Sequence, residues 1–223
     1  MASQAKLDQA AANGFSLEAV RRFADPPEDV DWEADIVLVS SPPPPEAAPP
    51  AVLMDPGNED ELIPVSFAVS RKAAAQSTLL RDLVASEAPD AEITVPVQGT
   101  ATALAFVVAF LEHHVDAGPL PAISRPLRPN ALSDLAEFDR RFVKALIPSD
   151  AEHLVCVDVL CVANYLGVGQ LVDLTSAGIG MILLGKSIPE IREVFRIPND
   201  LTDEQVAEIE KQNQQYLSAY PDS

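Results

Sequence analysis

Two clusters of proline divide this chain and limit where a folded core can form. One is a run of four at 42–45, and the other is spread over 116–136. Proline fixes φ and has no backbone N–H to donate, so helices and strands end at such clusters. We therefore expect an acidic, proline-rich, disordered tail over 1–50. A domain should follow over 51–184, with 116–136 as a flexible loop, and a separate C-terminal segment should cover 185–223.

The tail contains two stretches that could be structured. Residues 16–23 have the composition of a short helix. Ile36, Val37, Leu38 and Val39 follow an acidic run. Such a stretch resembles a SUMO-interacting motif, which adds as a strand to the edge of another protein's sheet. The alternatives are a strand that packs on this chain's own domain and a chance cluster.

Hydrophobic periodicity after residue 50 predicts short strands among many helices. The fold class we expect is therefore α+β and mainly helical. The expected strands are 51–54, 64–69 and 93–97, and the expected helices are 70–75, 77–84, 102–114, a helix from 138, 150–165, 170–184, 189–195 and 203–216. Ser77 and Asp150 are expected to cap the helices that follow them. Ser187 with Glu190, and Thr202 with Gln205, have the spacing of capping boxes. Gly167 and Gly169 predict a tight turn between two helices.

The charge excludes two classes of partner. Fifteen Lys and Arg stand against 34 Asp and Glu, for a net charge of −19. This field repels phosphate backbones and anionic lipid, so we expect no nucleic-acid partner and no membrane partner. The longest apolar run, 101–111, is shorter than the roughly 20 residues that span a bilayer. Two cysteines and no signal-peptide pattern fit a soluble protein of the cytoplasm and nucleus.

Residues suited to catalysis or metal binding are few. His113 and His114 are adjacent, so on a helix they point about 100° apart and do not chelate one metal together. Cys156 and Cys161 lie in an apolar helical stretch, as buried structural thiols do. His153 stands three residues before Cys156, but no orienting residue or oxyanion motif accompanies them. We expect no catalytic residue, no cofactor and no metal, and thus no enzyme.

A set of motifs in a fixed order resembles a known family. In the C-terminal half these are Asn164, Tyr165 and Leu166, then 171–175, Met181, Ile182, Gly185, Lys186, 190–192, Phe195, 199–202 and 211–214. Upstream they are Phe67, Val69, Ala75, Ser77, Leu79, Leu80, Leu83, Ile93, 95–97, His113, His114, Phe138, Asp139 and Phe142. This pattern, over about 51–217, is similar to that of the Skp family, the S-phase-kinase-associated adaptors of SCF ubiquitin ligases. The resemblance implies a BTB/POZ domain with a small three-stranded sheet, extended by two C-terminal helices.

The resemblance also implies two interaction surfaces. Asn164 and Tyr165 match family positions that meet the N-terminal domain of a cullin. The C-terminal helices of the family clasp the F-box of a substrate receptor. That role maps onto Ile191, Phe195, Asn199, Leu201, Val206, Ile209 and Tyr216.

The chain departs from the family pattern at two places. Gln215 stands where the family usually has a tryptophan, with Tyr216 one position later. Asp203 stands where some members have a modifiable proline. The function implied is a non-catalytic adaptor that joins a cullin to F-box receptors. The alternative is a diverged structural paralogue that binds one dedicated F-box-like partner without a cullin.

Overall fold

The computed structural model divides the chain into two units, Met1–Lys186 and Ser187–Ser223, and each is described by itself. It describes residues 15, 17, 20, 22–23, 30–41, 64–149 and 153–219. The side chains of 22–23 and 216–219 are outside the description.

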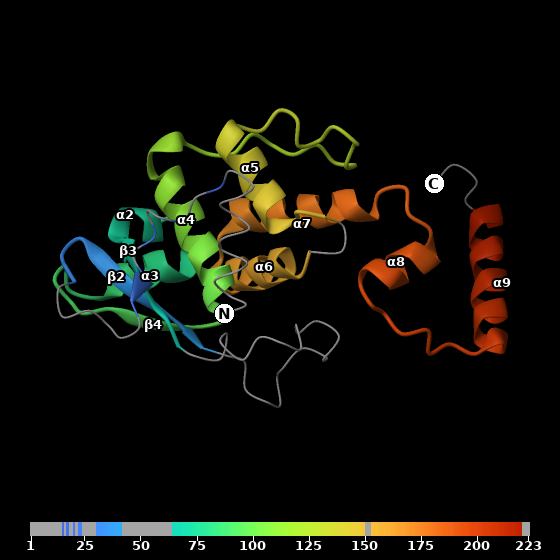
Figure 1. The fold of residues 1–223 in the computed structure, drawn as a ribbon, viewed down its shortest axis with the longest axis horizontal. Helices are drawn as coiled ribbons and strands as arrows, with labels where there is room; N and C mark the ends of the chain where they lie inside the picture. Colours follow the sequence, from blue (N-terminus) through green and yellow to red (C-terminus); the bar gives the residue numbers. More distant parts are fainter. Residues whose placement is uncertain are drawn as a thin grey trace. The chain divides into compact units, whose positions relative to one another are not determined.

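The first unit contains a sheet with the strand order β1-β3-β2-β4. Figure 1 labels its three longer strands, β2, β3 and β4. The strands are β1 (Arg22–Phe23), β2 (Asp35–Ser41), β3 (Ser66–Ser70) and β4 (Thr94–Gln98). Strand β2 pairs antiparallel with β3 and parallel with β4, so Leu38 lies opposite both Phe67 and Val95. The three longer strands form the small sheet of the expected α+β, mainly helical class, which is confirmed.

Strand β2 corrects the interpretation of the N-terminal region. Ile36, Val37 and Leu38 have no exposed surface, and Val39 is half-buried. Both edges of the strand are paired within this chain. The SUMO-interacting motif is therefore wrong, because a strand bonded on both sides has no free edge to offer. The alternative of a strand on the chain's own domain is correct.

The expected tail therefore does not cover 35–41. The expected helix over 16–23 is also wrong at its end, where Arg22–Phe23 forms strand β1. The expected strand at 51–54 and the expected helix cap at Asp150 lie outside the described residues.

Helix α4 (Ala101–Ala117) is the centre of the helical layer. Most of its side chains are buried, including Leu104, Phe106 and Leu111, and every residue from Ala101 to Val108 is buried. It packs against β2 and β3 on one side and against α6 (Leu154–Leu166) on another (Figure 1). A helix that is apolar all round has to be covered on every side.

The remaining helices surround α4 or follow it in sequence. Within the first unit they are α2 (Arg71–Ala74), α3 (Thr78–Ser86), α5 (Glu137–Leu146) and α7 (Gly169–Leu183). The second unit holds α8 (Ile188–Val194) and α9 (Asp203–Ala219). Among the described residues, no helix combines the length and apolar character needed to cross a membrane.

The segment expected as a flexible loop lies along α7 at three points. The N–H of Leu120 donates to Gln170 Oε1 at 2.8 Å, and Arg125 pairs with Asp173 at 2.8 Å. Farther along, a Cβ on Gly180 would lie 2.8 Å from Leu127 Cδ2, so the absent side chain leaves room for the loop. These contacts fix the path of the loop in the structure, while its flexibility stays a prediction.

A polar pair joins α4 to α5 inside the core. His114 Nε2 and Asp139 Oδ1 lie 2.9 Å apart, and both side chains are almost fully buried. Aromatic rings surround the pair. Phe110 lies 4.3 Å from His114 between centroids, and His113 stacks on Phe138 at 3.5 Å. The pair fixes how α5 packs against α4.

We expect Asp139→Ala to lower the free energy of unfolding by about 1–3 kcal/mol, because it leaves a buried ring nitrogen of His114 without its partner. Urea unfolding followed by circular dichroism measures this. The control is Asp134→Ala, an exposed carboxylate close by in sequence, which should change stability by less than about 0.5 kcal/mol. Equal effects of the two variants would contradict the structural role of the pair.

Candidate functional site

The first candidate surface lies at the C-terminal end of α6 and consists of Asn164 and Tyr165, which we call the α6 surface. Both side chains are exposed, and Tyr165 keeps 50% of its area accessible. Their neighbours Ala163 and Leu166 are fully buried in the same turn. A large aromatic side chain held in the open by a buried turn is typical of a binding anchor.

The N-terminus of α3 holds the end of α6 in place. Ser77 Oγ donates to the carbonyl oxygen of Leu166 at 2.5 Å, in a buried position. The same oxygen accepts from the N–H of Leu80 at 3.1 Å, which confirms Ser77 as the predicted cap of α3. The hydroxyl thus satisfies an otherwise unpaired group at each of two helix ends. It also fixes the backbone directly after Tyr165.

Gly167 completes this junction. Its φ of +69° is left-handed, as the helix C-cap requires. A Cβ there would lie 1.9 Å from Thr78 Oγ1. The N–H of Thr78 in turn lies 3.4 Å from the carbonyl oxygen of Gly167. Sequence reasoning named Gly167 as a turn but missed its contact with α3, which no local pattern encodes.

The second candidate surface lies on α8, α9 and the segment between them. Ile191, Phe195, Leu201 and Val206 are half-buried. Asn199 and Ile209 are exposed, with 42% of Ile209 accessible. Ile188 and Ile197 are exposed at 69% and 48%, although neither was among the predicted contacts.

Among the described residues of 187–215, none is fully buried. The apolar side chains described in this unit therefore keep part of their surface accessible, as the side chains of an interaction site do. For Tyr216, the described structure gives its place in α9 and nothing of its side chain.

Local bonds define the shape of the second unit. Both predicted capping boxes are present. The Glu190 carboxylate accepts from the N–H of Ser187 at 2.7 Å, and Gln205 Oε1 accepts from the N–H of Thr202 at 2.9 Å. Helix α8 ends in a Schellman turn, in which the N–H of Ile197 donates to the carbonyl oxygen of Arg192 at 2.8 Å.

The turn after α8 has an unusual residue at its left-handed position. Arg196 has a φ of +51°, which glycine adopts at lower cost. Arg192 also donates to Asn199 Oδ1, so a predicted contact residue is bonded within the unit. Sequence patterns predicted the caps, but not the Arg196 turn.

The residues considered for chemistry serve packing in the structure. Cys156 is buried, and burial raises the pKa of its thiol to about 12. His114 bonds Asp139, and His113 stacks on Phe138. No group of three potential metal ligands gathers within the part of the chain that the structure describes.

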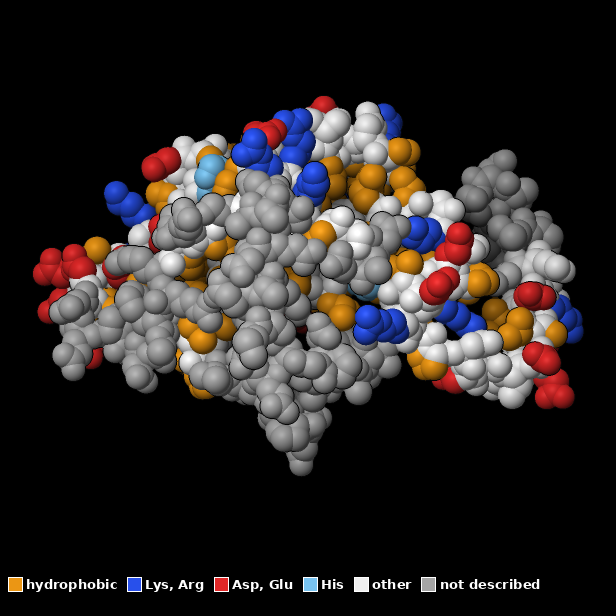
Figure 2. Space-filling view, viewed as in Figure 1, with side chains coloured by type: hydrophobic (Ala, Val, Ile, Leu, Met, Phe, Trp, Pro, Cys, Tyr) orange, Lys and Arg blue, Asp and Glu red, His pale blue; other side chains and the backbone are white. Residues whose placement is uncertain are grey.

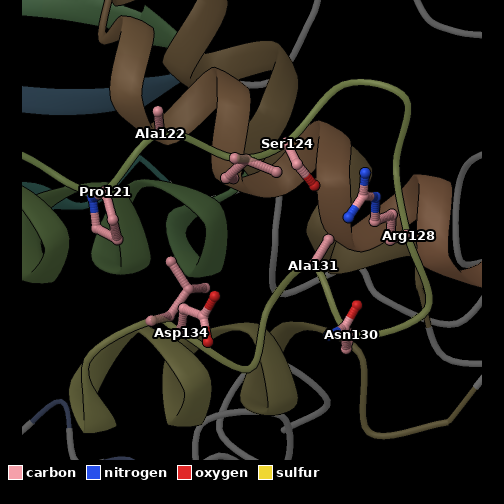
Figure 3. Close-up of a pocket in the computed structure, with 9 residues that line it drawn as sticks. Pro121, Ala122, Ser124, Arg128, Asn130, Ala131 and Asp134 are labelled. Carbon is pink, nitrogen blue, oxygen red and sulfur yellow. The ribbon is translucent and has the colours of Figure 1, made fainter.

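A small cavity of about 170 Å³ lies within the loop between α4 and α5 (Figure 3). Its lining includes Ser124, Arg128 and Asp134 and comes from residues 121–135 alone. This volume is well below the roughly 300–1,000 Å³ of small-molecule sites. Over α5 and this loop, Lys and Arg side chains gather on the surface (Figure 2).

Comparisons with known proteins agree on one family. Residues 169–215 match the Skp1 family, dimerisation domain. The S-phase kinase-associated protein 1 homolog of Tetrahymena thermophila is 31% identical over 157 residues, covering 70% of this chain and 87% of that protein. The SKP1-like protein 20 of Oryza sativa subsp. japonica is 30% identical, with 66% and 86% covered.

The name of a third relative refers to a protein complex. The SCF ubiquitin ligase complex protein SKP1b of Dictyostelium discoideum is 27% identical, with 66% of this chain and 87% of that protein covered.

The junction at Gly167 predicts a specific coupling with Thr78. Gly167→Ala should destabilise the protein by more than about 1 kcal/mol, because a side chain at positive φ is strained and its Cβ meets Thr78 Oγ1. Thr78→Ala in the same chain should recover part of this loss, with a coupling of about 1 kcal/mol. A double-mutant cycle in urea measures it, with Thr78→Ala alone as the control. Additive effects would show that the two residues do not meet.

The thiols should differ in reactivity. At pH 8 the folded protein should react with a thiol reagent at Cys161, which is exposed, while Cys156 should react only after unfolding. Burial and the nearby Asp158 charge also raise the pKa of Cys161, so its reaction should accelerate as the pH rises. Cys161→Ser is the control and should be nearly inert when folded. Rapid labelling of folded Cys161→Ser would contradict the burial of Cys156.

Proposed function

Because this chain belongs to the Skp1 family, we propose that it is a non-catalytic adaptor of an SCF-type cullin-RING ubiquitin ligase. In this role it joins the N-terminal domain of a cullin to F-box proteins, which bring substrates for ubiquitination. The observation that carries the proposal is the similarity to Skp1 homologues over most of their length, one of which is named as an SCF ubiquitin ligase complex protein.

The open apolar surface of the second unit supports binding of the F-box. Ile188, Ile197 and Ile209 expose between 42% and 69% of their areas. Half-buried Phe195, Leu201 and Val206 accompany them. Contact with an apolar helix of a partner would remove this surface from water, which favours association by roughly 25 cal/mol for each Å² buried. The matched family region, 169–215, spans this unit as far as Gln215.

The α6 surface supports binding of the cullin. Tyr165 is an exposed aromatic side chain on a turn whose backbone is fixed by Ser77. A fixed anchor loses little conformational freedom on binding, so more of its contact energy appears as affinity. The charge of −19 favours partners with a complementary basic surface.

The mechanism requires no reacting group on this chain. Joining a substrate receptor to a ligase scaffold makes substrate and ligase parts of one complex, and the effective concentration of the substrate near the ligase rises accordingly. We place this activity in the cytoplasm and nucleus. The alternative, a paralogue that binds one dedicated partner without a cullin, is an outcome of the tests below.

The cullin contact is tested by Asn164→Ala together with Tyr165→Ala. Truncating an aromatic anchor commonly costs about 2 kcal/mol, so cullin recovery with the tagged protein should fall about thirtyfold while F-box proteins remain. Quantitative mass spectrometry of the purified complexes measures both. The matched control is Cys161→Ser, an exposed residue one turn earlier on α6. Recovery of a single partner and no cullin with the wild-type chain would overturn the adaptor function.

The F-box contact is tested in the same way with Ile209→Asp. A carboxylate within an apolar contact should reduce the recovery of F-box proteins at least tenfold and leave cullin binding intact. The control, Ala207→Asp, adds the same charge at an exposed position about 200° away around α9. Equal losses from the two variants would contradict the placement of the F-box surface on the side of Ile209.

A further inference from the structure

A short N-terminal segment lies in an aromatic groove of the first unit. Its described residues are Phe15, Leu17, Val20 and strand β1, and together we call them the N-terminal strap. Phe15 is only 3% exposed. Leu17 and Val20 are partly buried against the same core. The expected disordered tail therefore contributes a side chain to the centre of the domain.

Three phenylalanines form the groove that holds Phe15. The ring of Phe15 stacks on Phe106 of α4 at 5.6 Å, and it meets Phe138 and Phe142 of α5 edge-on, each at 5.3 Å. Offset stacked and edge-to-face contacts are the favoured aromatic geometries. The site thus fits a phenylalanine in shape and in ring orientation.

Strand β1 extends this contact onto the sheet. Arg22 lies opposite Phe67, and Phe23 opposite Ser66, in antiparallel pairing on the outer edge of β3. An aromatic anchor followed by a short strand is a recurring way in which a peptide binds a folded domain by strand addition. Backbone bonds then give affinity, and the anchor pocket gives specificity.

Contacts that do not involve the strap also hold the groove together. Phe142 meets Phe106 at 5.7 Å and Phe110 at 5.6 Å, both edge-on, and Phe138 is stacked by His113. These contacts join α4 and α5 without Phe15. A preformed apolar site of this kind is ready to take a ligand.

The opposite edge of the sheet is less suited to strand addition. In the parallel β2–β4 ladder, the carbonyl of Ile93 and the N–H of Gly99 face β2. Pro96 lies at the alternate position, facing outward, and has no N–H to donate. Within the described sheet, the outer edge of β3 is therefore the better edge for an added strand.

Strand β1 is the most weakly held part of the described sheet. It has two residues, lies at the end of the strand order and is paired on one side only, with β3. Short elements at the edge of a structure open locally before the whole domain unfolds.

We propose that the groove of Phe106, Phe138 and Phe142, together with the outer edge of β3, is a peptide-docking surface that the strap occupies within the same chain. Its partner is a protein segment with the chemistry of the strap: an aromatic anchor followed, within about eight residues, by an extended strand. This surface is built from α4, α5 and β3, and it is separate from the residues proposed for the cullin and the F-box. The strap regulates access, because a tethered occupant competes at a millimolar effective concentration.

The test uses the full chain with Phe15→Ala and a fluorescent peptide of residues 12–24. Anisotropy should show the peptide binding this variant at least tenfold more tightly than the wild-type chain, whose own Phe15 fills the groove. A control peptide with Phe15→Ala should bind the variant at least tenfold more weakly than the unchanged peptide. A variant with a native circular dichroism spectrum that binds neither peptide, or both equally, would overturn the proposal.

If Phe15→Ala fails to fold, a second measurement, on the wild-type chain, tests whether the strap opens. Native-state hydrogen exchange should show the amides of Arg22 and Phe23 opening at least a hundredfold more often than those of Val37 and Leu38 in β2. Excess peptide with an intact Phe15 should increase this difference by holding the strap open. Equal protection of β1 and β2 would make the strap a permanent part of the core and overturn the proposal.

Discussion

Helix α4 is the element on which the rest of the first unit depends. Its apolar surface on all sides has to be covered, and the sheet, α5 and α6 are arranged to cover it. The cost of exposing this helix forces elements distant in sequence into one core. The buried contact of His114 with Asp139 then fixes one orientation of α5, because apolar packing alone is less selective about direction.

The same core supplies the rigidity of the α6 surface. Leu166 is buried beneath Tyr165, and the carbonyl of Leu166 is bonded to Ser77. The exposed side chain of Tyr165 is therefore attached to a turn that is buried and hydrogen-bonded. The second unit is held in shape by local bonds instead of a buried core. Its shape comes from capping boxes and a Schellman turn, while its apolar residues stay partly open. One candidate surface is built by tertiary packing and the other by local hydrogen bonds.

Helix caps could be predicted from the sequence because they depend on residues close together in the chain. Ser77, Ser187 and Thr202 were predicted as caps because a hydroxyl near a helix start satisfies free N–H groups, and the structure shows the Ser77 cap and both capping boxes. Strand β2 was misinterpreted because a central strand, buried on both faces, is a short apolar run with no alternation. The same four residues would suit a motif that binds another protein. Only the pairing of Leu38 with both Phe67 and Val95 distinguishes the two.

The sequence by itself determined the class of fold, the helix starts at Ser77, Ser187 and Thr202, and the order of motifs that resembles the Skp family, because these depend on residue type and spacing. It placed Asn164, Tyr165 and the α8–α9 residues on candidate surfaces through that resemblance. The tertiary structure decided which apolar residues stay exposed, how Ser77 holds the end of α6, and that Phe15 enters the core. These features depend on contacts between residues as much as 127 positions apart, as in the case of Phe15 and Phe142. No local pattern records such contacts.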